Sequence, residues 1–289
     1  MVNGQWQKEL ANFSFNTTGQ MRHLKADGTA NVRDLGGWNT ASGLPIRYGK
    51  IFRGAEWNGG HNLEPEAIEA LRQAGIKAEL DLRSNSEANN ITKSVLGDDI
   101  TYKRTPLAQT ASHMEGLTNS KDTYKTALLF IMTCVRNDKP VYFHCAIGRD
   151  RTGTLAFLLE GVLGMSKSDI YKDYELTNFS FFDTPCSKGQ LDEMFSTVEA
   201  MEGETLEQKF RTYLRTYFSI TNANIDKFRA KMLGKDDETS MKEVSETMFN
   251  GQYLMSNEIY DLFGRKILSS QLQPGIYISN GKKVLKWTK

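Results

Sequence analysis

The feature that most constrains this chain is the segment His144–Gly153, with the sequence HCAIGRDRTG. It follows a short apolar run at 141–143 and precedes an apolar-periodic stretch at 154–163. We therefore expect a strand, a tight loop and the beginning of a helix. Because a helix N-terminus presents unpaired backbone N–H groups and the positive end of the helix dipole, such a loop readily binds anions, most commonly phosphate.

Cys145 and Arg151 are the chemically active side chains of this segment. A cysteine near cations at a helix N-terminus ionises more readily than a free one, and the thiolate is the nucleophile. Arginine presents a planar fork of donors that matches two phosphate oxygens. Thr152 can hydrogen-bond the sulfur, and Gly148 lets the backbone approach a ligand closely. The alternative, a buried and inert cysteine, suits a lone Cys better than one followed by this motif.

Length and composition limit the classes of protein to consider. The 289 residues suffice for one large domain or two modest ones. Lys and Arg number 36 against 35 acids, and this net charge of +1 argues against bulk binding to nucleic acid or anionic membranes.

Three cysteines imply no disulfide framework. No apolar run approaches the roughly 18 residues of a transmembrane helix. Residues 1–20 lack the apolar core of a signal peptide, although the chain could begin after a natural leader.

Two other segments carry charged pairs beside turns or strand ends. Arg33 and Asp34 precede two glycines, which predicts a sharp turn that holds a charged pair, either functional or a surface salt bridge. The run 76–82 predicts a strand that delivers Asp81 and Arg83 at its carboxyl end, where sites of open α/β sheets lie. These two either share the pocket of Cys145 or pair with each other, or with Arg33 and Asp34, to brace it.

The remaining pattern indicates an α/β domain followed by a small β appendage. Helical spacing of apolar residues occurs at 124–135, 166–176, 189–201, 205–218 and 222–233, whereas 109–122 is polar and suggests a lid or a long loop. We divide the chain into an N-terminal extension at 1–20, a domain at 21–235, a charged linker at 236–247 and an appendage at 248–289. Within the appendage, Asn280-Gly281 between alternating runs predicts a hairpin.

Taken together, the motifs resemble those of the protein tyrosine phosphatase superfamily. Cys145-x5-Arg151-Thr152-Gly153 is similar to its signature loop. Further motifs resemble a bacterial subgroup of tyrosine and lipid phosphatases whose loop reads HCxxGKDRTG; they are Asn31–Gly37, Phe52-Arg53, Asp81–Ser84 with Glu87, and Asp173-Tyr174 with Leu176–Asn178. The resemblance covers roughly 28–235. It implies a mainly parallel central sheet flanked by helices, and no metal or other cofactor.

The resemblance also implies a mechanism, in which a cysteinyl-phosphate forms on Cys145 and is then hydrolysed. Phosphate oxygens would contact Arg151 and the loop residues Ala146, Ile147, Gly148, Arg149 and Thr152. The subgroup favours Asp150 as the proton donor, with Asp81 and Asp34 as alternatives. Supporting roles would fall to His144, Arg33, Asp34, Asp81 and Arg83.

One departure bears on the substrate. This chain has Arg149 where the subgroup usually has Lys, and a planar, permanently charged side chain contacts phosphate differently. We expect a phosphorylated protein as substrate, carrying phosphotyrosine and also phosphoserine or phosphothreonine. A phosphoinositide or inositol phosphate is the alternative. A hypothesis of another class is a phospho-ligand binding module without turnover, against which the intact Cys145 and Arg151 argue.

The C-terminal tail is similar to a different kind of module. The motifs at 259–265, 274–278 and 281–284 resemble C-terminal sorting modules of secreted Bacteroidetes proteins. The resemblance implies an extracytoplasmic location, whether periplasmic, surface or secreted. The alternatives are a β appendage that packs on the catalytic domain, and a cytoplasmic protein.

Overall fold

The computed structural model describes residues 22–88, 90–180 and 185–233, together with the backbone of four strands between 259 and 286. The chain divides into two compact units, Met1–Leu233 and Gly234–Lys289, and each is described by itself. Within the described residues, the structure contains no helix that is both long enough and apolar enough to cross a bilayer. The extension predicted at 1–20 and the linker predicted at 236–247 lie outside the described residues.

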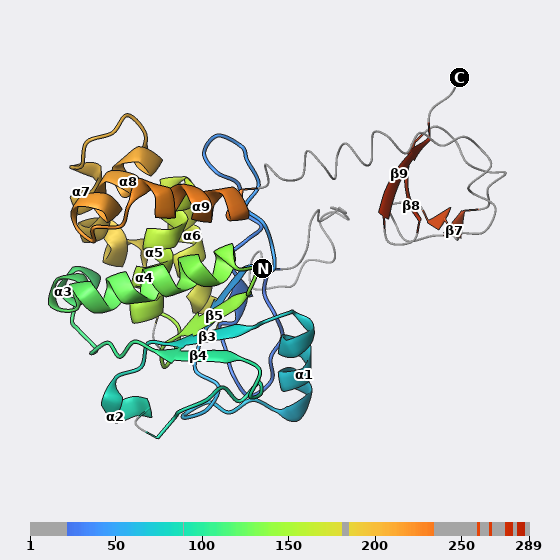
Figure 1. Cartoon of the computed structure of the whole chain (residues 1–289), viewed down its shortest axis with the longest axis horizontal. Coiled ribbons are helices and arrows are strands. Elements are labelled where there is room, and N and C mark those ends of the chain that lie inside the picture. The colour runs from blue at the N-terminus through green and yellow to red at the C-terminus, as the bar shows by residue number, and fades with distance from the viewer. Residues whose placement is uncertain are drawn as a thin grey trace, which may run out of the picture. The chain divides into compact units, whose positions relative to one another are not determined.

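A mixed, mostly parallel sheet forms the centre of the first unit (Figure 1). Its strands in spatial order are β1 (Arg33–Asp34), β2 (Ile51–Gly54), β5 (Val141–His144), β3 (Ala78–Asp81) and β4 (Thr101–Arg104). Only β1 and β2 pair antiparallel, while β2, β5, β3 and β4 are parallel neighbours. The predicted α/β class with a mainly parallel sheet is confirmed.

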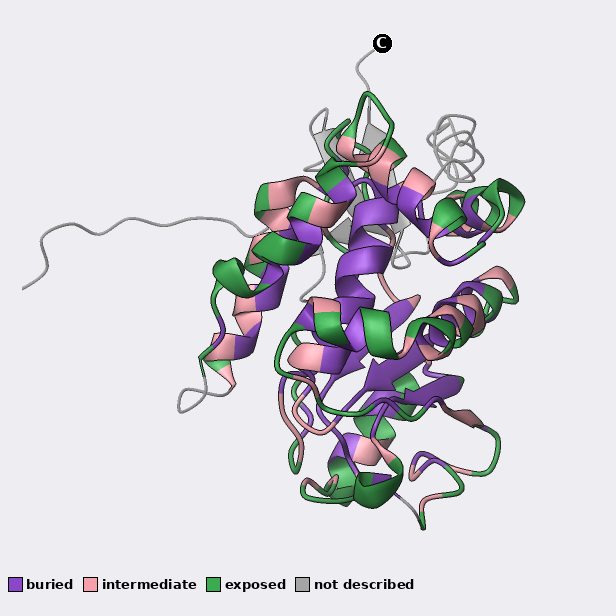
Figure 2. Ribbon diagram, turned by 90° about the vertical axis from the view of Figure 1, so that its left-hand side faces the viewer, coloured by how far each residue is buried: buried purple, intermediate pink, exposed green. Residues whose placement is uncertain are grey.

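Helices cover both faces of this sheet because its strands are apolar on both sides. On β5, Val141 and Phe143 pack in the larger core with α4 and α5, whereas Tyr142 joins a second core with Leu71 of α1. The strands β2, β3 and β5 are accordingly buried in Figure 2, whereas the edge strand β4 is partly exposed. The helices of the unit are α1 (Pro65–Gln73), α2 (Asn85–Ala88), α3 (His113–Asn119), α4 (Lys121–Arg136), α5 (Asp150–Leu163), α6 (Lys167–Glu175), α7 (Asp192–Glu199), α8 (Leu206–Thr216) and α9 (Asn222–Met232), with short 3-10 turns at Leu176–Phe179 and Lys188–Leu191.

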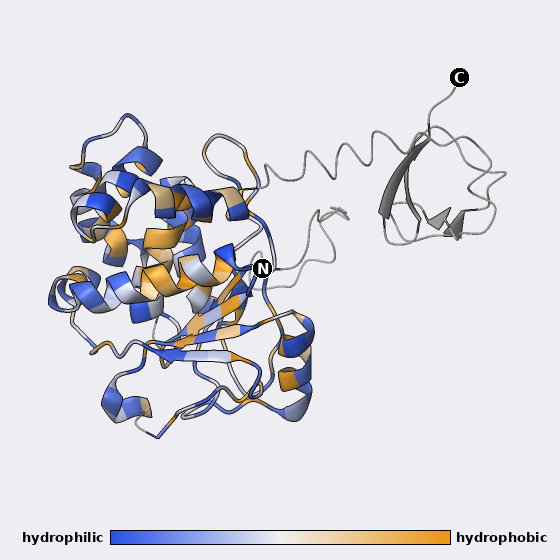
Figure 3. Ribbon diagram, viewed as in Figure 1, coloured by the Kyte–Doolittle hydropathy of each residue, from blue (hydrophilic) through white to orange (hydrophobic). Residues whose placement is uncertain are grey.

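Helix α5 is the central helix of the unit. Every residue from Arg151 to Leu163 is buried, as expected for a helix that is apolar on all sides. Outer helices such as α7 and α8 show mostly hydrophilic residues on their visible surface, and apolar residues gather on β3 and β5 (Figure 3). Gly164 ends α5 in the left-handed conformation. The burial of α5 fixes the position of its N-terminus, which carries the HCAIGRDRTG loop.

The prediction of a lid or long loop at 109–122 is wrong in part, because α3 occupies 113–119. The Ser112 side chain accepts a hydrogen bond from the Glu115 N–H, and the Glu115 carboxylate accepts one from the Ala111 N–H. This Ser-x-x-Glu pattern is a helix-start signal that could have been read from the sequence.

The second unit contains a four-stranded antiparallel sheet in the order β7-β6-β8-β9. Its strands are β6 (Ile259–Tyr260), β7 (Lys266–Ile267), β8 (Gly275–Ser279) and β9 (Lys282–Lys286). Ser279 pairs with Lys282, so the hairpin predicted at Asn280-Gly281 is confirmed.

Candidate active site

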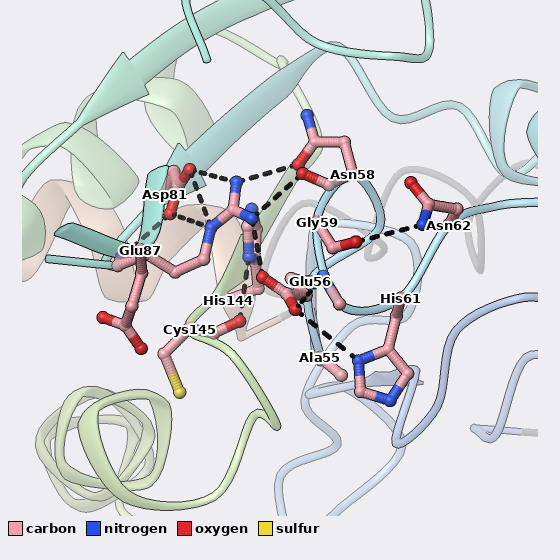
Figure 4. Close-up of polar contacts among 12 residues, drawn as sticks. Ala55, Glu56, Asn58, Gly59, His61, Asn62, Asp81, Glu87, His144 and Cys145 are labelled. Carbon is pink, nitrogen blue, oxygen red and sulfur yellow. Dashed lines mark hydrogen bonds and ion pairs between the residues drawn. The ribbon is translucent and has the colours of Figure 1, made fainter. Parts of the chain in front are cut away.

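The carboxyl ends of three parallel strands meet at one edge of the sheet. His144 at the end of β5 is in register with Gly54 at the end of β2 and with Asp81 at the end of β3. Cys145 follows His144 directly, and both are drawn in Figure 4 with residues from the neighbouring strand ends. The strand order therefore surrounds the loop after β5 with the segments that follow β2 and β3.

Each carbonyl group of the loop segment Cys145–Gly148 is held by a donor. In the order of these carbonyls, the donors are His144 Nδ1 (3.1 Å), the Glu56 N–H (3.0 Å), Asn31 Nδ2 (3.1 Å) and Arg53 Nη2 (3.1 Å). In a trans peptide the C=O of one residue and the N–H of the next residue point in opposite directions. The N–H group after each bonded carbonyl therefore points away from the donor of that carbonyl. Among the described residues, none accepts a hydrogen bond from the N–H groups of 146–148. The loop is thus a cradle of unpaired donors, suited to an anion.

Gly148 is required by this loop geometry. Its φ is 73°, which L-residues with a side chain rarely adopt. A Cβ atom at this position would lie 2.3 Å from the Gly54 carbonyl oxygen. Any larger residue would therefore push the loop away from β2.

A buried ion network supports the donors Asn31 and Arg53. The Asp173 carboxylate accepts hydrogen bonds from Arg53 Nη1 (2.8 Å) and from Arg33 Nε (3.3 Å). Although burial alone would raise it, the pKa of Asp173 is lowered by the charges of Arg33 and Arg53. Arg33 also donates to the Asn31 side chain, so the network orients the amide that holds the loop.

The prediction that Arg33 and Asp34 form a charged pair is wrong. Arg33 pairs with Asp173, and the carboxylate of Asp34 accepts the Gly36 N–H (2.8 Å) and the Gly49 N–H (2.6 Å). Both residues are buried rather than on a surface turn. Burial raises the pKa of Asp34 to about 6, against the opposing effect of these two hydrogen bonds.

His144 lies fully buried directly before Cys145 in the chain. Its Nε2 is 3.0 Å from Glu79 Oε1, and its Nδ1 is 3.1 Å from the Cys145 carbonyl oxygen. Burial works to lower the pKa of His144, but the carboxylates of Asp81 and Glu79 raise it above its usual value. An imidazolium with both ring N–H groups donating fits this arrangement. It would place a positive charge next to Cys145.

Arg151 is held by two partners that leave part of its guanidinium available. Its Nη1 donates to Glu87 (2.5 Å) and to the Leu107 carbonyl (3.2 Å), and its Nη2 donates to Glu87 (2.8 Å). A guanidinium has five N–H donors. Within the described residues these three bonds leave the Nε–H and one Nη2–H without a partner. Two donors on one edge can bind two phosphate oxygens.

Asp150 is the loop carboxylate at the surface. It is the first residue of α5, and 32% of its side chain is exposed. It pairs with Arg149, whose Nε lies 3.0 Å from its Oδ1. Asp34 and Asp81 are buried, and both carboxylates are occupied by donors of their own surroundings. Of the three acids suggested by the sequence, Asp150 alone combines an exposed carboxylate with a place in the loop.

Asp81 and Arg83 pair with each other, as one of the alternatives predicted, and brace the site. Arg83 Nη2 lies 2.6 Å from Asp81, and Arg83 Nη1 lies 2.6 Å from Glu56. Arg83 also donates to the Asn58 side chain (2.8 Å). This cluster ties the segment after β2 to β3, and the Glu56 N–H is one of the donors to the catalytic loop.

The Asp81 cluster gives a pH-dependent prediction. Although burial would raise it, His144 and Arg83 lower the pKa of Asp81 to about 2. A depressed folded-state pKa contributes stability above the unfolded value, and this contribution is lost as pH falls through the folded value. We expect Asp81→Asn to lower the free energy of unfolding by about 2 kcal/mol at pH 7. The loss should shrink between about pH 4 and pH 2.

Urea unfolding at pH 7, 5 and 3 measures this dependence. Asp122→Asn, on the exposed surface of α4, is the control and should change stability by less than about 0.5 kcal/mol. A loss for Asp81→Asn that is the same at pH 7 and pH 3 would contradict the account.

The structure does not bear out the hydrogen bond predicted between Thr152 and the Cys145 sulfur. Thr152 is fully buried, and among the described residues its hydroxyl has no hydrogen-bond partner. Thr152 lies in the first turn of α5, and the packing of that helix, which sequence spacing alone does not reveal, sets its position.

A cavity of about 100 Å³ lies beside Asp150 and Arg151. Its lining includes residues that the sequence analysis did not select, among them His113 of α3, Tyr124 of α4 and Gln190. The start signal of α3 could have located His113 on a helix. No local pattern indicates that this helix packs against α5.

Comparison with known families agrees with this geometry. A model described as the tyrosine phosphatase family matches residues 24–234. The chain belongs to this family. The match covers the sheet, the HCAIGRDRTG loop and helices α1 to α9.

Two curated relatives carry tyrosine phosphatase names. A Cupriavidus necator protein named as a tyrosine-protein phosphatase is 30% identical over 180 residues, which are 55% of this chain and 64% of the relative. A tyrosine-protein phosphatase of Nostoc commune is 28% identical over 127 residues, or 38% of this chain and 42% of the relative. The chain thus matches less than two thirds of the length of either relative.

Solved structures give weaker likenesses. The core catalytic domain of a PP-IP phosphatase from S. cerevisiae has 15% identity and a TM-score of 0.39, covering 59% of this chain and 88% of that one. P. aeruginosa TpbA has 14% identity and a TM-score of 0.37, covering 64% and 98%. At such scores these likenesses add nothing to the family assignment.

Proposed function

We propose that this protein is a cysteine-dependent phosphatase that hydrolyses phosphomonoesters through a cysteinyl-phosphate intermediate. The observation that carries the proposal is the loop geometry. The carbonyls of Cys145–Gly148 are all bonded, whereas among the described residues the N–H groups of 146–148 and two donors of Arg151 have no partner. Such preorganised donors stabilise the equatorial oxygens of a phosphoryl group in transfer.

The reaction takes two steps at phosphorus. The Cys145 thiolate attacks in line, an S–P bond forms, and the P–O bond to the leaving group breaks while Asp150 donates a proton to the departing oxygen. Water then attacks the cysteinyl-phosphate, Asp150 accepts its proton, and the S–P bond breaks to release inorganic phosphate and the thiolate. The N–H groups of 146–151 and the Arg151 guanidinium hold the equatorial oxygens in both steps.

A quenched single-turnover reaction tests the proposal directly. With a radiolabelled aryl phosphate, covalently bound label should appear on the peptide that contains Cys145 and disappear as phosphate is released. A folded, reduced protein that binds phosphate but forms no labelled peptide and releases no phosphate would favour the phospho-ligand binding module instead.

Asp150 as the proton donor gives a separate prediction. Replacing it with Asn removes the transferable proton while keeping the size of the side chain. We expect Asp150→Asn to lower kcat/KM for an alkyl phosphate by roughly 10²-fold, and for an aryl phosphate with a good leaving group by only a few fold. Steady-state assays on both substrates measure the difference. Equal losses on the two substrates would remove Asp150 from this role.

We assign the protein to the tyrosine and lipid phosphatase subgroup, with phosphotyrosine, phosphoserine and phosphothreonine proteins as substrates. Arg149 supports the phosphoinositide alternative, because its partly exposed guanidinium adds a second cation at the rim of the loop. A panel of phosphopeptides and inositol lipids distinguishes the two. Turnover of the lipids at rates above those of all peptides would overturn the assignment of protein substrates.

We further propose an extracytoplasmic location, supported by the resemblance of 259–284 to sorting modules. The paired strands β6 to β9 are compatible with a separate small module. Fractionation of the source cells tests this location. Full-length protein confined to the cytoplasmic fraction would exclude it.

A further inference from the structure

A chain of hydrogen bonds connects three helices at the first turn of α5. His113 of α3 has its Nδ1 2.7 Å from Thr154 Oγ1 and its Nε2 3.0 Å from the Tyr174 hydroxyl of α6. The Thr154 hydroxyl lies 3.1 Å from the Asp150 carbonyl oxygen. His113 and Tyr174 are also in edge-to-face ring contact, with centroids 5.4 Å apart. All three side chains are almost completely buried.

The direction of each bond follows from the number of hydrogens available. Thr154 has one hydroxyl hydrogen, and a bond to the Asp150 carbonyl uses it. Thr154 Oγ1 can then only accept from His113, so His113 Nδ1 carries a hydrogen. In a neutral ring Nε2 accepts from the Tyr174 hydroxyl, and burial favours this form by lowering the pKa of His113. The chain therefore runs from Tyr174 through His113 and Thr154 to the backbone of Asp150.

The end of this chain is the residue whose orientation matters most for proton transfer. Asp150 begins α5 and, together with His113 and Thr154, lines the cavity of about 100 Å³ beside Arg151. The connection between β4 and α3 contributes the Leu107 carbonyl, which accepts a hydrogen bond from Arg151. Its residues 105–112 contain no carboxylate that could replace Asp150. His113 of α3 thus contacts α5 through Thr154, and the segment before α3 contacts Arg151.

We infer that His113 is a positioning residue that holds the first turn of α5, and with it the Asp150 carboxyl, in the orientation from which the leaving oxygen receives its proton. The inference rests on the proposed function and on Asp150 as the acid. His113 itself does not touch the substrate. Displacements of the order of 1 Å in such a group can cost roughly 10²-fold in rate.

Leaving-group dependence separates positioning from a merely structural role. A variant that is partly unfolded loses activity on every substrate in equal proportion. A variant whose acid is misplaced loses activity only where the leaving oxygen needs a proton. The parameter to compare is kcat/KM, because it reports the steps up to formation of the cysteinyl-phosphate and is unaffected by its hydrolysis.

The experiment uses the full-length chain and three variants along the hydrogen-bond chain. They are His113→Ala, Thr154→Val and Tyr174→Phe, and each is assayed on an alkyl phosphate and on an aryl phosphate with a good leaving group. Thr126→Val and Tyr171→Phe are matched controls. Thr126 donates to the carbonyl four residues before it on α4, and Tyr171 on α6 donates to Asp192, both away from the site. His113→Asn is the rescue variant, since its amide can donate from near the position of Nδ1.

We expect His113→Ala to lower kcat/KM for the alkyl phosphate by roughly 10- to 100-fold and for the aryl phosphate by less than about 3-fold. His113→Asn should recover part of the loss. Thr154→Val and Tyr174→Phe should show a smaller loss with the same preference for the alkyl phosphate. The controls should have the kcat/KM values of the parent chain. Inhibition by inorganic phosphate should stay unchanged in all.

Two results would overturn the inference. One is an equal loss on both substrates in His113→Ala, with no recovery in His113→Asn. The other is an unaltered alkyl to aryl ratio in a folded His113→Ala protein. Both are distinct from failure of the proposed function, in which the parent chain releases no phosphate from either substrate and the Cys145→Ser variant behaves identically.

Discussion

Cys145→Ser is expected to abolish turnover of aryl phosphates, by roughly 10³-fold or more, while phosphate still binds. A serine hydroxyl is a much weaker nucleophile than a thiolate, and Asp150, the acid assigned to the leaving group, is no base for it. The cradle for the anion remains, because its donors are backbone N–H groups and Arg151. Assays of phosphate release give the activity, and calorimetric titration with inorganic phosphate or tungstate gives the binding.

The other cysteines supply controls for this substitution. Cys134 and Cys186 are buried, and burial raises the pKa of each thiol, which makes them poor nucleophiles. Cys186→Ser and Cys134→Ser should therefore keep the activity of the parent chain, apart from any loss of stability. Residual turnover in Cys145→Ser near that of the parent chain would show that another group attacks phosphorus.

Arg151→Lys is expected to lower kcat/KM by roughly 10²- to 10³-fold on every phosphomonoester. Lysine keeps the charge, but it lacks the planar fork that contacts Glu87 and Leu107 on one side and leaves two donors for phosphate on the other. The loss should be the same for alkyl and aryl substrates, because it concerns the transferred phosphoryl group rather than the leaving group. This uniformity distinguishes it from the effect of Asp150→Asn.

Arg149→Lys is the matched control, two residues away in the same loop. Lysine keeps a cation at this position, and its ammonium can still pair with Asp150. We expect a change of less than about 3-fold on substrates with one phosphate. Equal losses in Arg149→Lys and Arg151→Lys would mean that general positive charge, rather than the geometry of Arg151, drives catalysis.

Local sequence patterns were sufficient for the elements whose formation depends on neighbours in the chain. The strand before Cys145, helix α5 after it and the hairpin at Ser279–Lys282 were all predicted, because apolar periodicity, helix-start residues and Asn-Gly turns act over a few residues. Helix α3 was missed although its Ser112-x-x-Glu115 start was present. The segment is polar and lacks apolar periodicity, so this short capping pattern is its only local signal of a helix.

Local sequence patterns do not predict which residues form hydrogen bonds with the loop. Asn31 and Arg53 hold carbonyls that lie 116 and 95 residues further along the chain, and Glu87 holds Arg151 across 64 residues. These contacts exist because the sheet places β2 and β3 on either side of β5. Motif resemblance pointed to the segments that contain them, but not to which donor meets which acceptor.

The HCAIGRDRTG loop separates what the sequence determines from what only the tertiary structure decides. The sequence by itself singles out Cys145, Arg151 and the helix N-terminus, since their chemistry depends on residue type and on spacing within ten positions. Only the tertiary structure separates Asp34, Asp81 and Asp150, because packing buries Asp34 and Asp81 among donors of their own and leaves Asp150 partly exposed beside Arg149. Packing alone also brought His113 to the first turn of α5, since the contact joins two helices that no local signal relates.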